Sequence, residues 1–291
     1  MITLTSPTTR TLDVPGARLT FDVRPNREIT EPPLMLIGSP MGAAGFATLA
    51  SHFPERTVVT YDPRGVERST KTDPSTESTP EQHADDLHAV IEAVGGPVDL
   101  FASSGGAVNA LALVARHPGE VRTLVAHEPP LASLVADSDT ARAAVRDVAR
   151  TYQERGFGAG MAKFILLVSH DGEIPAGLLA GDVDPTMFGL PAADDGRRTD
   201  PLLFQNVISC THYEPDVEAL RSASTRIVPG VGEESRRGLA GRGGAAIAER
   251  LGVDSVSFPG GHDGFLGGEY GSTGKPDAFA QRLREVLDGL A

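Results

Sequence analysis

The sequence predicts an α/β fold with a mostly parallel central sheet, helices on both faces of that sheet, and one helical insertion. Short apolar runs alternate with helical patterns along most of the chain, which is typical of parallel sheets. One segment of roughly 80 residues interrupts this alternation and is far longer than an ordinary connection. With 291 residues, the chain is long enough to bury a sizeable core.

The first half of the chain contains the expected strands and one helix start. A helix is predicted from Thr79, which can be the N-cap, with Pro80 as the first helical residue and Gln82 as the capping-box partner. Its apolar positions recur at helical spacing up to Val94. Strands are expected at residues 19–23, 33–37, 57–61 and 98–102.

The second half continues the same alternation after the insertion. A helix over 105–117 and a strand over 121–126 are expected before the insertion. After it, we expect strands at 226–228 and 255–258 and helices at 239–251 and 276–287. The insertion covers residues 132–213 and divides the core into 1–131 and 214–291. It has helical patterns at 139–155, 159–170 and 202–210, and we expect it to form a cap over the sheet.

Composition excludes several classes of protein. The formal net charge of −13 argues against a nucleic-acid-binding protein, and no run of 18 apolar residues suggests a membrane span. The start of the chain lacks the features of a secretion signal, and the single cysteine, Cys210, cannot form an internal disulfide, so we expect a cytoplasmic protein. Cys210 lies in an apolar stretch and is expected to pack as a small hydrophobic residue. The eight histidines are scattered and there is no phosphate-binding loop, so neither a metal nor a cofactor is expected.

The most informative stretch joins the strand at 98–102 to the helix that follows it. Its sequence, Ala102-Ser103-Ser104-Gly105-Gly106, is the small-x-Ser-x-Gly pattern of a nucleophile elbow. Ser104 has small residues two positions before and after it, whereas Ser103 follows Phe101 at that distance. The tight turn would place Ser104 at a helix N-terminus, where a developing anion is stabilised.

Four segments together resemble the α/β-hydrolase superfamily over nearly the whole chain. They are Ile37-Gly38-Ser39-Pro40, the run from Tyr61 to Ser69, the elbow at Ser104, and Phe258-Pro259-Gly260-Gly261-His262. The sequence is similar to capped bacterial members, including proline-iminopeptidase-like and epoxide-hydrolase-like enzymes. Its serine differs from the aspartate nucleophile of epoxide hydrolases and haloalkane dehalogenases.

The resemblance implies roles for individual residues. Ser104 would be the nucleophile, and His262 would be the general base that activates it. The backbone N–H groups of Gly105 and Ser39 would form the oxyanion hole. Ile37 stands where the family usually has histidine, and Pro40 has no N–H to donate.

The acid of the triad has three candidates. The family's usual position, after the strand at 226–228, is occupied by Ser235, which cannot carry the required charge. Glu234 or Glu233 could supply the carboxylate from that loop. Glu128, which directly follows the strand at 121–126, ranks above both, although it could instead pair with Arg64.

The expected substrate pocket is mainly apolar. We expect Met41, Phe164 and Phe204 to contact a small-molecule substrate. Acidic residues at Asp171, Asp182, Asp184, Asp194 and Asp195 could recognise an amine, as an iminopeptidase needs, but a solvated loop is the favoured interpretation. Arg64 is expected to brace neighbouring loops through bidentate hydrogen bonds.

These features predict a cofactor-free serine hydrolase that cleaves an ester, thioester, lactone, amide or C–C bond through an acyl-enzyme. The alternative is a protein with the same fold that does not hydrolyse: a lyase, a cofactor-free oxygenase-type enzyme or a small-molecule binding protein. No nucleic-acid or membrane partner is expected, and the sequence leaves open whether the chain forms a homodimer.

Overall fold

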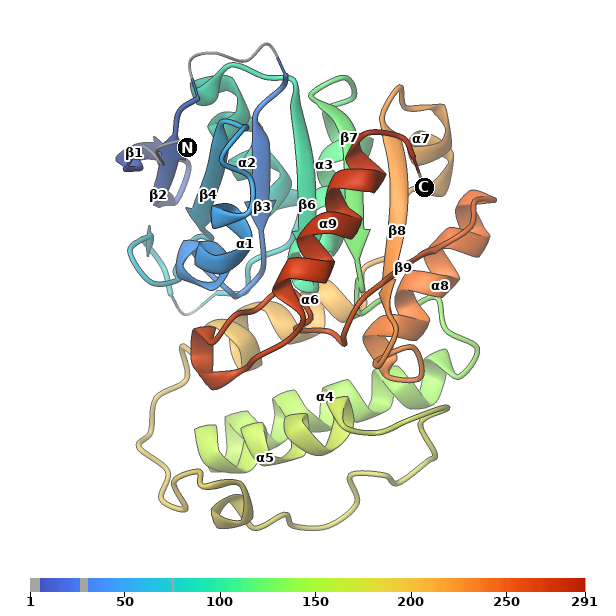
Figure 1. Ribbon diagram of the computed structural model, residues 1–291. Helices are drawn as coiled ribbons and strands as arrows, with labels where there is room; N and C mark the ends of the chain where they lie inside the picture. Colours follow the sequence, from blue (N-terminus) through green and yellow to red (C-terminus); the bar gives the residue numbers. More distant parts are fainter. Residues whose placement is uncertain (1–5, 27–30, 75, 291) are drawn as a thin grey trace.

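A nine-stranded sheet forms the centre of the computed structural model, which describes residues 6–26, 31–74 and 76–290 (Figure 1). The expected absence of a secretion signal rests on the first residues of the chain, and residues 1–5 lie outside the described range. The strands are β1 (Thr8–Val14), β2 (Ala17–Arg24), β3 (Leu34–Ile37), β4 (Val58–Asp62), β5 (Thr70–Lys71), β6 (Val98–Ser103), β7 (Val121–His127), β8 (Arg226–Gly232) and β9 (Val256–Phe258).

Helices lie between most of these strands. They are α1 (Ala47–Ser51), α2 (Pro80–Val94), α3 (Gly105–Arg116), α4 (Ser138–Arg155), α5 (Phe157–Val168), α6 (Val207–Thr211), α7 (Val217–Ser222), α8 (Leu239–Leu251) and α9 (Pro276–Leu287). The predicted helices at 239–251 and 276–287 are confirmed to the residue, and those at 105–117 and 139–155 to within one residue at each end.

The sheet is mostly parallel, as predicted. Its strand order is β1-β2-β4-β3-β6-β7-β8-β9, and every neighbouring pair from β4 to β9 is parallel. The antiparallel strands β1 and β5, which the sequence analysis did not identify, both pair with β2. β1 contains few apolar residues and is largely exposed. It therefore lacks the apolar run from which the other strands were predicted.

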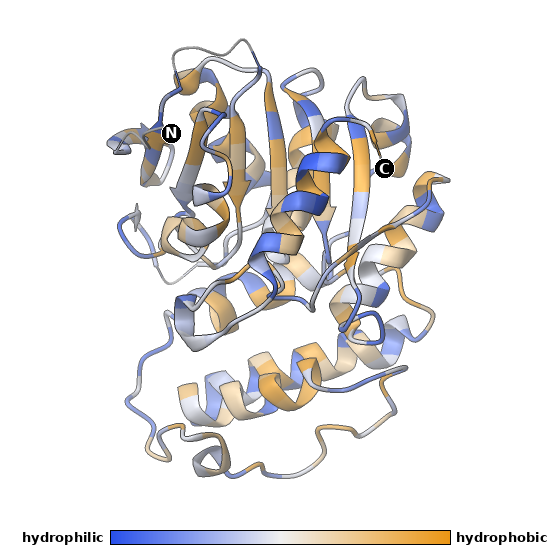
Figure 2. Ribbon diagram, in the orientation of Figure 1, coloured by the Kyte–Doolittle hydropathy of each residue, from blue (hydrophilic) through white to orange (hydrophobic). Residues whose placement is uncertain are grey.

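Alternating residues of the central strands build two separate cores. Met35, Leu100 and Leu124 face the side covered by α2 and α3, while their neighbours Leu36 and Phe101 face the side covered by α1 and α9. This follows from the two-residue period of a strand and requires both faces to be apolar. Figure 2 shows the resulting concentration of hydrophobic residues along the central strands.

The start of α2 is fixed by the predicted capping box. The Thr79 hydroxyl accepts a hydrogen bond from the Gln82 backbone N–H, and the Gln82 side chain accepts one from the Thr79 backbone N–H. Pro80 occupies the first turn, where its missing N–H costs nothing. Gly95 ends the helix in the left-handed conformation with φ of 86°.

The segment between β7 and β8 contains α4 to α7. Of these helices, α4 to α6 lie at the carboxyl end of the sheet, whereas α7 lies near its amino end, beside the start of β8 (Figure 1). The segment has its own apolar cluster, in which Val145, Val148 and Tyr152 of α4 pack with Leu167 of α5. The predicted helix at 202–210 begins instead as a π-helical stretch over Pro201–Asn206 and continues as α6. No helix within the described part of the chain is both long enough and apolar enough to cross a bilayer.

A buried ion pair connects the loop after β4 to α2. Arg64 donates from Nε and Nη2 to the two carboxylate oxygens of Asp86, at 2.7 and 2.6 Å, and both side chains are almost fully buried. The bidentate geometry confirms the structural role expected for Arg64 and shows that it does not pair with Glu128.

We predict that Asp86→Ala lowers the free energy of unfolding by about 3–5 kcal/mol, because it leaves the Arg64 guanidinium buried without a counter-charge. The control is Asp13→Ala, which removes an exposed ion pair with Arg18 and should cost roughly 0–1 kcal/mol. Urea unfolding measures both values. Equal losses in the two variants would contradict the structural role of the Arg64–Asp86 pair.

Candidate active site

Ser104 occupies a strained turn between β6 and α3. Its φ and ψ are 58° and −128°, a combination that is uncommon for any residue other than glycine. Its backbone N–H is held by the carbonyl oxygen of His127 at 3.0 Å, and its carbonyl accepts from Ala107. The structure therefore has the strand–turn–helix context that a nucleophile elbow requires.

The glycines after Ser104 allow α3 to contact the end of β3. A β-carbon on Gly105 would lie 2.6 Å from the carbonyl oxygen of Ser39, and one on Gly106 would lie 2.8 Å from the backbone of Gly38. Any larger residue would force these segments apart. The close approach places Ser39 beside the N-terminus of α3, where the sequence analysis expects the oxyanion hole.

His262 and Glu128 form a hydrogen-bonded pair. His262 Nδ1 lies 2.7 Å from Glu128 Oε2, with the imidazole 43% exposed and the carboxylate fully buried. Because Nδ1 is engaged by a carboxylate, it carries the proton, and Nε2 is left to act as an acceptor. A buried carboxylate on Nδ1 of a partly exposed histidine is the arrangement that orients a general base.

Two further donors stabilise the Glu128 carboxylate. Its Oε1 accepts from the backbone N–H of Gly232 at 2.8 Å and from the Ser235 hydroxyl at 2.6 Å. Burial opposes ionisation, but the hydrogen bonds from His262 and Ser235, with the nearby imidazoles, hold the pKa of Glu128 below its usual range. Its backbone φ of 50° makes it a second strained residue at this site.

Among the described hydrogen bonds and ion pairs, neither of the other two acid candidates contacts His262. Glu234 is exposed and forms an ion pair with Lys275 at 2.6 Å. Glu233 is also exposed, and its backbone N–H donates to Phe258. Ser235, which occupies the position where the family usually has its acid, instead donates to Glu128. The sequence analysis identified this position but missed its function as a donor.

A cavity of about 410 Å³ lies between the sheet and the insertion. Ser104, Gly105, Ser39, His262 and Glu128 all line it, so the structure brings together the residues predicted from widely separated segments. The remaining lining is mainly apolar. It includes the predicted residues Met41 and Phe164 together with Val145, Leu167, Val207, Phe265 and Leu266.

Phe204 does not line this cavity, contrary to the expectation from the sequence. It packs instead against the apolar cluster of the insertion. Leu202 and Asn206 are four residues apart and share one face of this helical stretch, whereas Phe204 is two residues from each and lies on the other face. Leu202, Asn206 and Val207 face the cavity in its place.

The acidic residues considered for amine recognition have other partners. Asp182 pairs with Arg155, Asp194 with Arg198 and Asp195 with Arg197, while Asp184 caps a short turn at Thr186. Asp171 is exposed, and none of the five lines the cavity. These contacts agree with the favoured interpretation of a solvated loop.

Asn206 is a buried polar residue of the cavity that the sequence analysis did not identify. Its Oδ1 accepts from the Ser39 hydroxyl at 3.3 Å and lies 3.1 Å from His83 Nε2. Burial and the positive charge of Arg64 lower the pKa of His83 to about 3, so this histidine is neutral and donates through Nε2. No local motif identified this network, because its members come from three distant segments.

His127 occupies an aromatic cage behind the His262–Glu128 pair. Its ring centroid lies 5.3–6.4 Å from those of Phe279, Phe258, Phe101 and Phe265, and neither ring nitrogen has a hydrogen-bond partner in the described structure. Burial, aided by the nearby His262, outweighs the attraction of Glu128 and lowers the pKa of His127 to about 4. His127 is therefore a neutral packing residue at neutral pH.

Cys210 also lines the cavity, but it is not a reactive thiol. Burial raises its pKa to about 12, so the thiolate is not populated at neutral pH. This agrees with the expectation that Cys210 packs as a small hydrophobic residue.

One group with metal-ligand spacing occurs among the described residues, and it lies outside the cavity. It consists of His88, His117 and Glu120. The sequence analysis found no metal-ligand spacing among the histidines, because the fold, and not their spacing along the chain, brings these three side chains together.

Comparisons with known proteins agree with this architecture. A family model described as alpha/beta hydrolase fold matches residues 32–165. An uncharacterized hydrolase from Bacillus subtilis, YraK, is 29% identical over 286 residues, covering 96% of this chain and 95% of its own.

Solved structures share the fold at lower identity. A thermophilic esterase from Thermogutta terrifontis superposes with a TM-score of 0.66 at 19% identity, covering 98% of this chain and 99% of the esterase. The carboxylesterase CesB of Bacillus subtilis has a TM-score of 0.63 at 16% identity, covering 98% and 93%.

We predict that the stability of the protein falls as the pH decreases from about 6.5 toward 4. Over this range an unfolded histidine binds a proton that buried His127 does not, so stability rises with pH by up to about 1.4 kcal/mol per pH unit for this group. His127→Phe, which fits the aromatic cage, should reduce this slope. Urea unfolding at several pH values measures it. If the substitution only changed packing, it would change the free energy of unfolding by the same amount at every pH. Parallel plots of this free energy against pH for the native protein and His127→Phe would therefore contradict the prediction.

Proposed function

We propose that this chain, which has the alpha/beta hydrolase fold, is a serine hydrolase of that superfamily in which Ser104, His262 and Glu128 form the catalytic triad. The single observation that carries this proposal is the convergence of three features on one cavity. These are the strained serine at the start of α3, the His262–Glu128 hydrogen bond, and the close approach of Ser39 to Gly105.

In the first step, the Ser104 Oγ attacks the carbonyl carbon of the substrate while Nε2 of His262 accepts its proton. The resulting imidazolium is stabilised by the Glu128 carboxylate at Nδ1. Protonated His262 then donates to the leaving group, and the C–O bond breaks to give an acyl-enzyme. Water, deprotonated by the same Nε2, releases the acid and restores Ser104.

The backbone N–H groups of Gly105 and Ser39 stabilise the oxyanion. The N-terminus of α3 adds the partial positive charge of its free N–H groups. Asn206 positions this hole from the insertion, because its Oδ1 accepts from the Ser39 hydroxyl and so fixes the segment after β3. Residues 132–213 thus serve as a cap that both covers the cavity and contacts the catalytic core.

The substrate class follows from the lining of the cavity. The described lining residues include two acids, Glu128 and Asp263, and no lysine or arginine. A carboxylate on the substrate would find no counter-charge and would be repelled. We infer that the enzyme acts on uncharged esters of small, apolar acids, in keeping with the esterases that share its fold.

The test of the triad is labelling by a fluorophosphonate, measured as intact mass and as a rate. We predict a single adduct on the native chain that is absent from Ser104→Ala. Glu128→Gln should slow labelling by roughly 10³–10⁴-fold, because an amide presents the wrong hydrogen-bonding group to His262 and cannot stabilise its charge.

The matched control is Glu234→Gln, which removes the other candidate acid at an exposed ion pair and should label at the native rate. Equal effects of the two substitutions would exclude Glu128 as the acid. A folded native protein that takes no label would exclude an activated Ser104, and a non-hydrolytic role for the cavity would then replace the proposal.

We also predict that p-nitrophenyl butyrate is hydrolysed with a kcat/KM roughly tenfold or more above that of p-nitrophenyl hydrogen succinate, since a tenfold ratio needs only 1.4 kcal/mol of repulsion. The two acyl groups are similar in length but differ in charge. Asp263→Asn should reduce the ratio of the two kcat/KM values, because it removes one acid from the lining of the cavity. Equal or faster turnover of the charged ester would contradict the proposed substrate class.

A further inference from the structure

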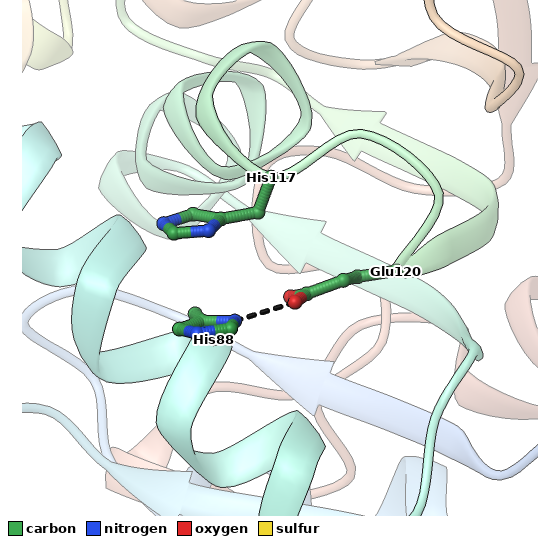
Figure 3. Close-up of side chains that lie close together, drawn as sticks. All are labelled: His88, His117 and Glu120. Carbon is green, nitrogen blue, oxygen red and sulfur yellow. Dashed lines mark hydrogen bonds and ion pairs between the residues drawn. The ribbon is translucent and has the colours of Figure 1, made fainter.

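Two histidines and a glutamate meet at the end of α3 that is farther from the cavity. His88 lies on α2, His117 directly follows α3, and Glu120 precedes β7 (Figure 3). α3 has 12 residues and is therefore about 18 Å long, so this group and Ser104 lie at opposite ends of one helix. The three side chains offer ligand atoms that all lie within 4.8 Å of one another.

The two imidazole rings are parallel and the carboxylate lies at their edge. Their centroids are 4.2 Å apart with an interplanar angle of 7°, and His88 Nδ1 contacts Glu120 Oε1. The second carboxylate oxygen of Glu120 is buried and has no hydrogen-bond partner in the described structure. A buried carboxylate oxygen without a donor is costly unless a cation or another donor satisfies it.

A carboxylate hydrogen-bonds the other nitrogen of His117, and another lies near that of His88 without bonding it. His117 Nε2 lies 3.1 Å from Asp85 Oδ1, and His88 Nε2 lies 3.7 Å from Glu92 Oε2. Histidines that bind metals usually direct their second ring nitrogen to a carboxylate, which fixes the ring and raises its basicity. This leaves Nδ1 of both rings, together with Glu120, as the ligand atoms.

The local charge favours a divalent cation. Asp85, Glu92 and Glu120 provide three negative charges, and Arg116, which binds Asp85, provides one positive charge. With neutral imidazoles, two negative charges are left unbalanced. The side chains of His88, His117 and Glu120 are 30%, 23% and 22% exposed, so an ion can reach them and water can complete its coordination.

We propose that His88, His117 and Glu120 bind one divalent transition-metal ion, for which Zn²⁺ is the best match. Two imidazole nitrogens and one carboxylate oxygen are ligands that Zn²⁺ prefers, whereas Ca²⁺ and Mg²⁺ prefer all-oxygen sites. An imidazole binds a metal through a lone pair in the plane of its ring, so binding requires at least one of the two parallel rings to rotate until both Nδ1 atoms point at the ion. The ion would join α2, the end of α3 and the start of β7.

The test uses the untagged full-length chain after treatment with EDTA. Titration calorimetry should show one equivalent of Zn²⁺ bound and no binding of Ca²⁺ or Mg²⁺ at the same concentrations. Zn²⁺ should raise the midpoint of thermal unfolding through mass action. Co²⁺ should give visible absorption bands of a nitrogen- and oxygen-ligated ion. A native protein that shows neither Zn²⁺ binding nor a thermal shift would overturn the proposal.

Variants assign the binding to this group. His117→Gln and Glu120→Gln should each weaken Zn²⁺ binding at least tenfold, and His88→Asn combined with His117→Gln should abolish both the thermal shift and the Co²⁺ bands. Thermal unfolding without metal shows whether each variant is folded. If a histidine variant is unstable, Glu120→Gln still tests the site, because residue 120 lies outside any helix.

Two controls separate this site from other histidines. His170→Gln changes a half-buried histidine elsewhere, whose Nε2 bonds the carbonyl oxygen of Glu173, and this variant should bind Zn²⁺ as the native protein does. Ser104→Ala should also bind normally, since the two sites are independent. Undiminished binding in the double variant would show that Zn²⁺ binds elsewhere and would overturn the assignment.

Discussion

The buried carboxylate of Glu128 is the interaction on which the geometry of the candidate site depends. It accepts hydrogen bonds from three parts of the chain beyond β7: the end of β8 at Gly232, the following turn at Ser235, and the loop after β9 at His262. A fully buried charge is tolerated only when such donors surround it. The same bonds that satisfy the charge therefore fix the three loops and aim the imidazole into the cavity.

Backbone strain is concentrated where this arrangement meets the sheet. Ser104 and Glu128 follow adjacent parallel strands, β6 and β7, and both have positive φ. The strands themselves are held rigidly by apolar packing on both faces, so the strain is imposed at the first residue beyond each strand. Parallel strands end at one edge of the sheet, which is why residues from distant positions can meet there.

Local signals explain why much of this could be predicted from the sequence. The elbow at Ser104, the capping box at Thr79 and the apolar runs of the central strands each depend on a few adjacent residues, and the structure has all of them. The π-helical turn before Asn206 was not predictable from apolar spacing, and apolar character alone did not show that Phe204 packs within the insertion and not toward the cavity. Likewise, the pairing of Ser235 with Glu128 and the grouping of His88 with His117 depend on contacts between distant segments, which spacing within the sequence does not encode.

The insertion does more than line the cavity, because it supplies an acceptor for two buried donors of the core. Ser39 and His83 are buried on the core, and each directs a donor at Oδ1 of Asn206 on the insertion. Without Asn206, both donors would be buried and unsatisfied, at a cost of roughly 1–3 kcal/mol each. The position of the insertion is thus coupled to the segment after β3 through a buried polar contact, while the apolar lining around it is free to vary in shape. A change in the apolar lining would alter the shape of the cavity, whereas a change at Asn206 would alter the segment after β3 itself.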